Sequence, residues 1–134
     1  MPTITLSIDL AAPLDEVWAV VGDFGNLDVW HPWVPACELA ADGETRIMRA
    51  GGQVVAQERL LEQRDYAHVY TVDHGPFPMD AYRAELSAVA VGAGCRVTYR
   101  STFEPNTPEV DVAAKLRRFF TTGFEALEAR YGAG

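Results

Sequence analysis

No lysine or arginine precedes Arg46, and the whole chain carries a formal net charge of −8. The same segment before Arg46 contains eight acidic residues, which are Asp9, Asp15, Glu16, Asp23, Asp28, Glu38, Asp42 and Glu44. Proteins that bind nucleic acid need cations to replace the counterions of the phosphate backbone, and an acidic surface repels nucleic acid and anionic lipid alike. We therefore expect no nucleic-acid partner and no membrane partner.

Cysteine is scarce, with Cys37 and Cys95 the two such residues in the chain. They are far apart and lack the paired spacing of zinc sites or small disulfide frameworks. The histidines, at positions 31, 68 and 74, also lack the spacing that places two imidazoles on one face of an element. We expect no metal and no other cofactor, and interpret both cysteines as small buried apolar residues.

Several further signals are missing. No apolar run approaches the roughly 18 residues of a membrane span, and no basic region followed by an apolar one marks a secretory leader. No Gly-x-Ser-x-Gly nucleophile motif and no glycine-rich phosphate loop occurs. Because 134 residues is an ordinary length for one domain, we expect a single cytoplasmic domain over residues 1–134.

The sequence does contain clear hydrophobic periodicity. Residues 3–10 alternate between apolar and polar, which predicts a strand with one solvent-facing side. Pro13 and the acidic residues after it predict the start of a short helix that ends at Gly22. Residues 23–29 predict a second short helix.

From residue 34 to residue 104, turn residues interrupt apolar segments at intervals of about ten to twenty residues. These turn signals are Asp42-Gly43, Gly51-Gly52, Arg64-Asp65, Gly75-Pro76-Phe77-Pro78 and Gly92-Ala93-Gly94. The intervals leave no room for crossover helices, so the strands are predicted to be antiparallel. A final amphipathic helix is predicted to be capped by Thr107, to start at Pro108 and Glu109, and to end near Arg130.

These elements predict an α+β fold in which a curved seven-stranded antiparallel sheet surrounds a long C-terminal helix. Sheet twist and curvature leave space between the sheet and the helix, lined by side chains from several strands. We expect this space to hold a small hydrophobic or aromatic ligand. We expect the helix to direct Leu116, Phe120 and Gly123 toward the sheet, with Gly123 allowing either close helix approach or cavity volume.

Several local strings support a family assignment. They are Glu16-Val17-Trp18, Asp23-Phe24, Trp30-His31-Pro32, Glu58-Arg59-Leu60, Asp80-Ala81-Tyr82 and Val97-Thr98-Tyr99. In this order, over nearly the whole chain, the sequence resembles the START-related, Bet v 1-like (SRPBCC) superfamily. Its bacterial polyketide cyclase/dehydrase-like branch is the most similar. The resemblance implies the helix-grip fold with an internal ligand cavity, and we expect a monomer or a homodimer.

The strings are also similar to the ligand-binding layout of the plant hormone receptors of this superfamily. That layout implies that Glu58 and Tyr82 face the cavity, and that the loops at residues 51–52 and 74–78 are gates at its mouth. His31 falls where those receptors place a ligand-binding lysine, and their signature gate residues are absent. Hormone sensing is therefore not expected.

Glu58, His31 and Tyr82 are the candidate catalytic residues. A carboxyl group facing an aromatic cavity has a raised pKa and serves as an acid or base near neutral pH. The alternative for Glu58 is a solvated side chain paired with Arg59, and strand alternation does not decide between the two faces. His31 is either a proton donor or acceptor toward the ligand or a structural loop histidine.

The candidate ligand contacts are mostly aromatic. They are Phe24, Trp30, Trp33, Tyr70, His74, Phe77, Tyr99, Leu116 and Phe120. Tyrosines suit a cavity because the ring packs against an apolar ligand while the hydroxyl makes one directed hydrogen bond. The alternative for each tyrosine is an ordinary core position.

Two functions remain open on these residues. One is a cofactor-independent cyclase/dehydratase-type enzyme of polyketide-like metabolism, in which Glu58, His31 and a tyrosine move protons. The other is a non-catalytic carrier or sensor of a hydrophobic metabolite. The fold does not separate them. The deciding observation is whether two titratable groups reach one ligand position.

Overall fold

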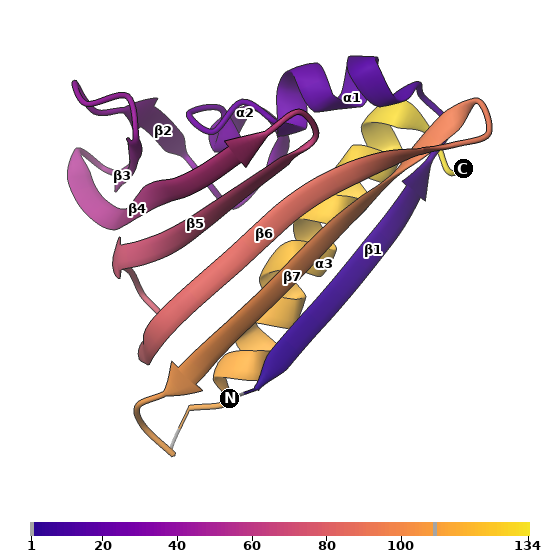
Figure 1. Cartoon of the computed structure of the whole chain (residues 1–134). Coiled ribbons are helices and arrows are strands. Elements are labelled where there is room, and N and C mark those ends of the chain that lie inside the picture. Colours follow the sequence, from indigo (N-terminus) through magenta and orange to yellow (C-terminus); the bar gives the residue numbers. More distant parts are fainter. Residues whose placement is uncertain (1, 109) are drawn as a thin grey trace.

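The computed structural model describes residues 2–108 and 110–134. The helices are α1 (Leu14–Val21), α2 (Leu27–Trp30) and α3 (Val112–Tyr131). The strands are β1 (Thr3–Leu10), β2 (Ala36–Leu39), β3 (Thr45–Ala50), β4 (Gln53–Arg64), β5 (Ala67–His74), β6 (Met79–Val91) and β7 (Gly94–Pro105). This confirms the predicted α+β class and the order of the elements (Figure 1).

The strands form one antiparallel seven-stranded sheet in the order β1-β7-β6-β5-β4-β3-β2. From β2 to β7 each strand pairs with the next one along the chain, and β1 joins the edge beside β7. Every predicted turn signal falls between two strands or at a strand end. Gly51 and Gly52 have φ values of 57° and 81°, which suits the tight two-residue hairpin between β3 and β4.

The long helix lies against one face of the sheet. In Figure 1, α3 runs alongside β6, β7 and β1, while β2 to β5 extend away from it, and α1 and α2 sit at one end of the sheet. Leu116, Phe120 and Phe124 on one side of α3 are buried, as the amphipathic pattern predicts. No helix among the described residues is long and apolar enough to cross a membrane.

Two helix boundaries differ from the prediction. The second helix spans only Leu27–Trp30. The terminal helix starts at Val112, because the Asp111 carboxylate accepts a hydrogen bond from the Ala114 N–H at 3.0 Å and so caps the helix. The predicted cap at Thr107 and start at Pro108 are therefore wrong, and Glu109 lies outside the described residues.

Candidate functional site: a cavity between the sheet and the long helix

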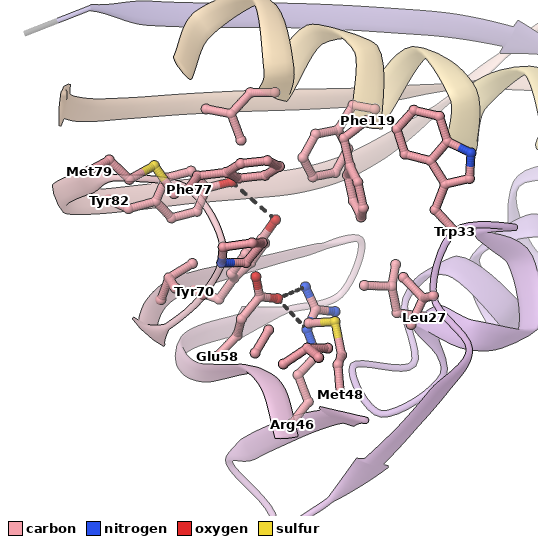
Figure 2. Close-up of a pocket in the computed structure, with 18 of the residues that line it drawn as sticks. Leu27, Trp33, Arg46, Met48, Glu58, Tyr70, Phe77, Met79, Tyr82 and Phe119 are labelled. Carbon is pink, nitrogen blue, oxygen red and sulfur yellow. Dashed lines mark hydrogen bonds and ion pairs between the residues drawn. The ribbon is translucent and has the colours of Figure 1, made fainter. Parts of the chain in front are cut away.

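A cavity of about 240 Å³ lies between the inner face of β3 to β6 and the first half of α3 (Figure 2). Its lining is Leu27, Trp33, Val34, Pro35, Arg46, Met48, Val55, Ala56, Glu58, Tyr70, Val72, Gly75, Pro76, Phe77, Met79, Tyr82, Leu116, Phe119 and Phe120. Most of these side chains are apolar, as in sites for small organic molecules. The volume lies just below the roughly 300–1,000 Å³ of drug-sized sites, so it suits a smaller molecule.

An ion pair forms the charged part of the wall. Arg46 on β3 lies directly opposite Glu58 on β4 in the strand register. Arg46 Nε and Nη2 lie 2.7 and 2.5 Å from the same carboxylate oxygen, Glu58 Oε1. Arg46 Nη1 donates to the Phe24 carbonyl at 3.2 Å, and the residue is only 4% exposed. Arg46 is thus buried and Glu58 half-buried, and several directed contacts hold the pair.

The aromatic rings around Arg46 complete its packing. Its guanidinium carbon lies 4.2 Å from the Phe24 ring centroid and 4.6 Å from that of Tyr70. Such contacts attract a cation to the face of a ring. Phe24 therefore supports the ion pair from behind, and it does not line the cavity.

A β-bulge brings Arg46 and Glu58 together. Arg49 pairs with Val54, but Met48 pairs with Ala56, so Val55 is an extra residue on β4. Beyond the bulge, every partner on β4 is shifted by one position, which is the defining effect of a bulge. A regular hairpin from the Gly51-Gly52 turn would place Gln57, not Glu58, opposite Arg46.

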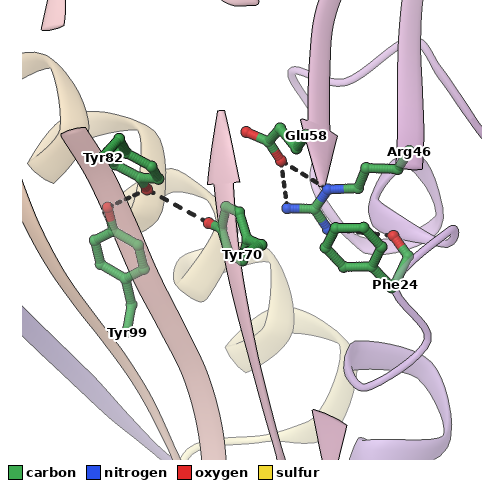
Figure 3. A network of polar contacts seen from close by, with 6 residues as sticks. All are labelled: Phe24, Arg46, Glu58, Tyr70, Tyr82 and Tyr99. Carbon is green, nitrogen blue, oxygen red and sulfur yellow. Dashed lines mark hydrogen bonds and ion pairs between the residues drawn. The ribbon is translucent and has the colours of Figure 1, made fainter. Parts of the chain in front are cut away.

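Glu58 lines the cavity, and its ion-pair partner is Arg46 rather than Arg59, the partner in the alternative interpretation. Arg59 instead pairs with Asp73 at 3.1 Å on the exposed face of the sheet. While Oε1 accepts both contacts from Arg46, Oε2 accepts no hydrogen bond from any residue that the structure describes, and it faces away from Arg46 (Figure 3). One carboxylate oxygen is thus left for a ligand.

Three tyrosine hydroxyls form a short chain beside this carboxylate. The Tyr82 and Tyr99 hydroxyl oxygens lie 2.6 Å apart, and those of Tyr70 and Tyr82 lie 3.5 Å apart (Figure 3). Tyr70 and Tyr82 line the cavity, whereas Tyr99 lies behind them, stacked on Phe120 with ring centroids 3.5 Å apart. Burial raises the pKa of Tyr70 and of Tyr82 well above the usual value, so both phenols are neutral donors.

His31 does not reach the cavity. Its Nε2 lies 2.7 Å from the Phe119 carbonyl oxygen, its Nδ1 accepts from the Trp33 N–H at 3.1 Å, and its ring stacks on Phe119. A carbonyl only accepts and an N–H only donates, so the ring is neutral with its proton on Nε2. Burial lowers the pKa of His31 and keeps this form. The residue ties the loop after α2 to α3.

The other candidate contacts divide between the cavity wall and its surroundings. Those that line the cavity are Trp33, Tyr70, Phe77, Leu116 and Phe120. His74 lies exposed at the end of β5, and Trp30 is buried against α3 at Gly123. A Cβ built at Gly123 would lie 2.7 Å from His31 Cδ2 and 2.9 Å from a Trp30 ring carbon, so this glycine permits close approach of α2.

Sequence reasoning missed part of the lining. Neither Arg46 nor Phe119 is among the candidate catalytic or ligand-contact residues of the sequence analysis. Both lie in the wall. Counting residues from the Gly51-Gly52 turn places Arg46 opposite Glu58 only if the extra residue at Val55 is known, so the sequence alone did not identify Arg46 as the partner of Glu58.

No group of three or more His, Cys, Asp or Glu side chains in residues 2–108 and 110–134 is placed to hold a metal.

Only one of the two loops predicted to be gates lines the cavity described by the structure. Gly75, Pro76 and Phe77 line the cavity, whereas the Gly51-Gly52 turn does not. Trp33 also lines the cavity and is 51% exposed, which places it at the rim. The greater mobility expected of the two loops in the absence of ligand remains a prediction.

The comparison with known families agrees with this architecture. Residues 1–132 match the family described as "Polyketide cyclase / dehydrase and lipid transport". The chain belongs to this family. Membership implies binding of a hydrophobic ligand, which the apolar cavity can accommodate. No match was found among curated proteins.

Solved structures show the same fold. A protein from Thermobifida fusca is 34% identical, with a TM-score of 0.82 over 98% of this chain and 94% of that one. XoxI from Bacillus cereus is 23% identical, with a TM-score of 0.89 over 98% and 96%. A START superfamily protein from Mycobacterium smegmatis is 17% identical, with a TM-score of 0.72 over 96% of both chains. These likenesses confirm the helix-grip architecture.

Proposed function

We propose that the protein binds a small, largely apolar organic molecule in the cavity between β3 to β6 and α3. The observation that carries the proposal is an apolar space of about 240 Å³ that borders the hydrophobic core of the protein. Protein interiors normally contain few voids larger than a water molecule, because every unfilled volume loses contacts. A retained cavity of this size is the usual form of a binding site.

Binding is testable with small aromatic probes. Native mass spectrometry and tryptophan fluorescence, with Trp33 at the rim as reporter, would follow naphthalene, indole and 2-naphthol. Ala56 lines the cavity, so Ala56→Leu grows into the empty space and should weaken binding at least tenfold. Ala90→Leu adds the same atoms at an exposed position and should leave binding unchanged. Failure of every probe to bind the unaltered protein would refute the proposal.

A second candidate is cyclase/dehydratase-type catalysis in the same cavity. The observation that favours it is the free oxygen of Glu58 in a space shared with the Tyr70 and Tyr82 hydroxyls. A carboxylate can take a proton from a substrate, and a neutral phenol can stabilise the developing oxyanion. His31 has no role in this scheme, because both of its ring nitrogens are occupied.

Catalysis and simple carriage differ in their response to Glu58→Gln. If Glu58 is a base, the amide should lower kcat by about 100-fold or more on a polyketide-like substrate, with a smaller change in KM. If the protein is a carrier, no product should form with either form of the protein. An active Glu58→Gln variant with unchanged kcat would exclude Glu58 as the base.

A further inference from the structure

We propose that the cavity selects a ligand whose polar end is an uncharged hydrogen-bond donor, such as a phenol or alcohol hydroxyl, and discriminates against carboxylates. This inference rests on the proposed binding function and specifies the chemical class of the ligand. It follows from the way in which Arg46, Glu58 and the tyrosines divide their hydrogen-bonding groups.

The positive charge in the cavity wall, that of Arg46, is paired with the carboxylate of Glu58. Arg46 directs Nε and Nη2 to Glu58 and Nη1 to the Phe24 carbonyl, and the Phe24 and Tyr70 rings pack against its guanidinium. Arginine commonly recognises carboxylates through two parallel N–H donors. Here those two donors, Nε and Nη2, both hold Oε1 of the protein's own carboxylate, so Arg46 positions Glu58 and this pair of donors is not available to an anionic ligand.

The group left to meet a ligand is an acceptor. Glu58 Oε2 accepts nothing from the described part of the chain and faces the cavity side of the ion pair (Figure 2). A hydroxyl that donates to this oxygen makes a charge-assisted hydrogen bond in an apolar space, where such bonds are strong. A ligand carboxylate would instead place a second anion beside Glu58.

The tyrosines can complete the recognition of a hydroxyl. The Tyr70 hydroxyl is only loosely engaged, since its distance to the Tyr82 hydroxyl is 3.5 Å, at the long limit of a hydrogen bond. Burial keeps Tyr70 protonated, so it can donate to a ligand oxygen whose own proton goes to Glu58. A hydroxyl uses both of these partners, which a purely apolar ligand cannot do.

Charge balance excludes a cationic ligand as the preferred class. The Arg46–Glu58 pair is neutral as a unit, and it lies in a wall that is otherwise apolar or phenolic. A bound ammonium would add an uncompensated charge to this enclosed space, and burial of an unpaired charge is costly. A neutral donor satisfies Glu58 Oε2 without that cost.

Three probes of one shape test the inference: 2-naphthol, naphthalene and 2-naphthoate, measured at neutral pH by calorimetry. The account predicts that 2-naphthol binds about tenfold more tightly than naphthalene, the factor expected from one charge-assisted hydrogen bond, and that 2-naphthoate binds most weakly. Equal affinities for 2-naphthol and naphthalene, or tightest binding of 2-naphthoate, would overturn the selectivity and leave the binding function intact. Failure of all three to bind would refute the binding function itself.

Substitutions separate the charge of Glu58 from its shape. Glu58→Gln leaves Arg46 without a counter-charge, so the preference for 2-naphthol should shrink about tenfold and 2-naphthoate should gain affinity. Glu85→Gln is the matched control, because Glu85 pairs with Arg64 away from the cavity lining, and it should change neither affinity. An unchanged ranking of the probes in Glu58→Gln would contradict the proposal.

A double variant covers the case in which Glu58→Gln fails to fold. Arg46→Met combined with Glu58→Leu replaces the buried pair by apolar side chains, a change that buried ion pairs often tolerate. This protein should bind naphthalene and 2-naphthol within about twofold of each other. If this variant still bound 2-naphthol tenfold more tightly than naphthalene, the ion pair would not be the group that recognises the ligand hydroxyl.

Discussion

Where β1 pairs with β7 the core is closed, whereas at β3 to β5 the same sheet encloses a cavity. Val97 and Leu127 at the closed end are 0% exposed, and α3 packs there against β1. At the open end, Leu116 of the same helix faces a space of about 240 Å³. One helix and one twisted sheet thus give a packed core where they lie close and a binding site where the sheet extends away. Stability is therefore expected to reside mainly at the closed end.

The largest expected effect comes from truncating a leucine at each end. Leu127→Ala should lower the free energy of unfolding by about 3–5 kcal/mol, because it opens a new void in closely packed surroundings. Leu116→Ala should cost only about 2 kcal/mol, because its side chain already borders an empty space and loses fewer contacts. Urea denaturation of both variants measures the difference. Equal losses would contradict the contrast between the two ends.

The second effect concerns a buried histidine behind the cavity wall. His68 is 1% exposed among Trp18, Phe24 and Tyr70, and neither ring nitrogen has a hydrogen-bond partner in the described residues. Burial, aided by the charge of Arg46, lowers its pKa to about 3. The unfolded chain takes up a proton at this histidine below about pH 6.5, whereas the folded protein does so only near pH 3.

His68 therefore makes the folded state lose stability as the pH falls from about 6.5, and its contribution does not change at higher pH. Between pH 6.5 and pH 4 this loss should amount to about 3 kcal/mol. His68→Phe keeps an aromatic ring and removes the titration, so its stability should fall less with acid than that of the unaltered protein. Urea denaturation at both pH values tests this, and parallel losses in the two proteins would count against it.

The third effect is the smallest, and it compares atoms added at the close contact between α3 and α2 with atoms added in the cavity. Alanine usually stabilises a helix relative to glycine. At Gly123, however, a Cβ would lie 2.7 Å from His31 Cδ2, so Gly123→Ala should cost about 1–3 kcal/mol through overpacking. Ala56→Leu adds more atoms, but it grows into the cavity and should change stability by less than about 1 kcal/mol. Thermal unfolding of both variants measures this, and a stabilised Gly123→Ala would show that α2 adjusts.

The sequence allowed the fold to be predicted because its local signals agree with one another. Alternation in residues 3–10, turn residues between consecutive strands from β2 to β7 and an apolar stripe in the last helix all indicate the same sheet and helix. The start of α3 was missed because a second possible cap, the acidic residue Asp111, competes with the Thr107-Pro108 signal. Thr and Asp are both favoured N-cap residues, so the capping pattern alone does not choose between them, and in the structure Asp111 makes the capping bond to the Ala114 N–H.

The site was less predictable. Glu58 and several aromatic residues do face the cavity, but alternation along β4 could not show this, because the bulge at Val55 reverses the face of every residue on one side of it. The ion pair with Arg46 depends on the same bulge. The position of His31 depends on two backbone groups, the Phe119 carbonyl and the Trp33 N–H. The pattern of side chains in the sequence does not predict contacts with backbone groups.

The most direct test of the central claim is a methyl NMR titration of the protein with 2-naphthol. The methyl groups of Met48, Met79 and Leu116 line the cavity, whereas those of Leu10 and Leu127 lie in the core away from it. The account predicts saturable shift changes at the three cavity methyls and much smaller ones at the two core methyls. Saturation without any change at Met48, Met79 and Leu116, or changes equally large at Leu10 and Leu127, would contradict it.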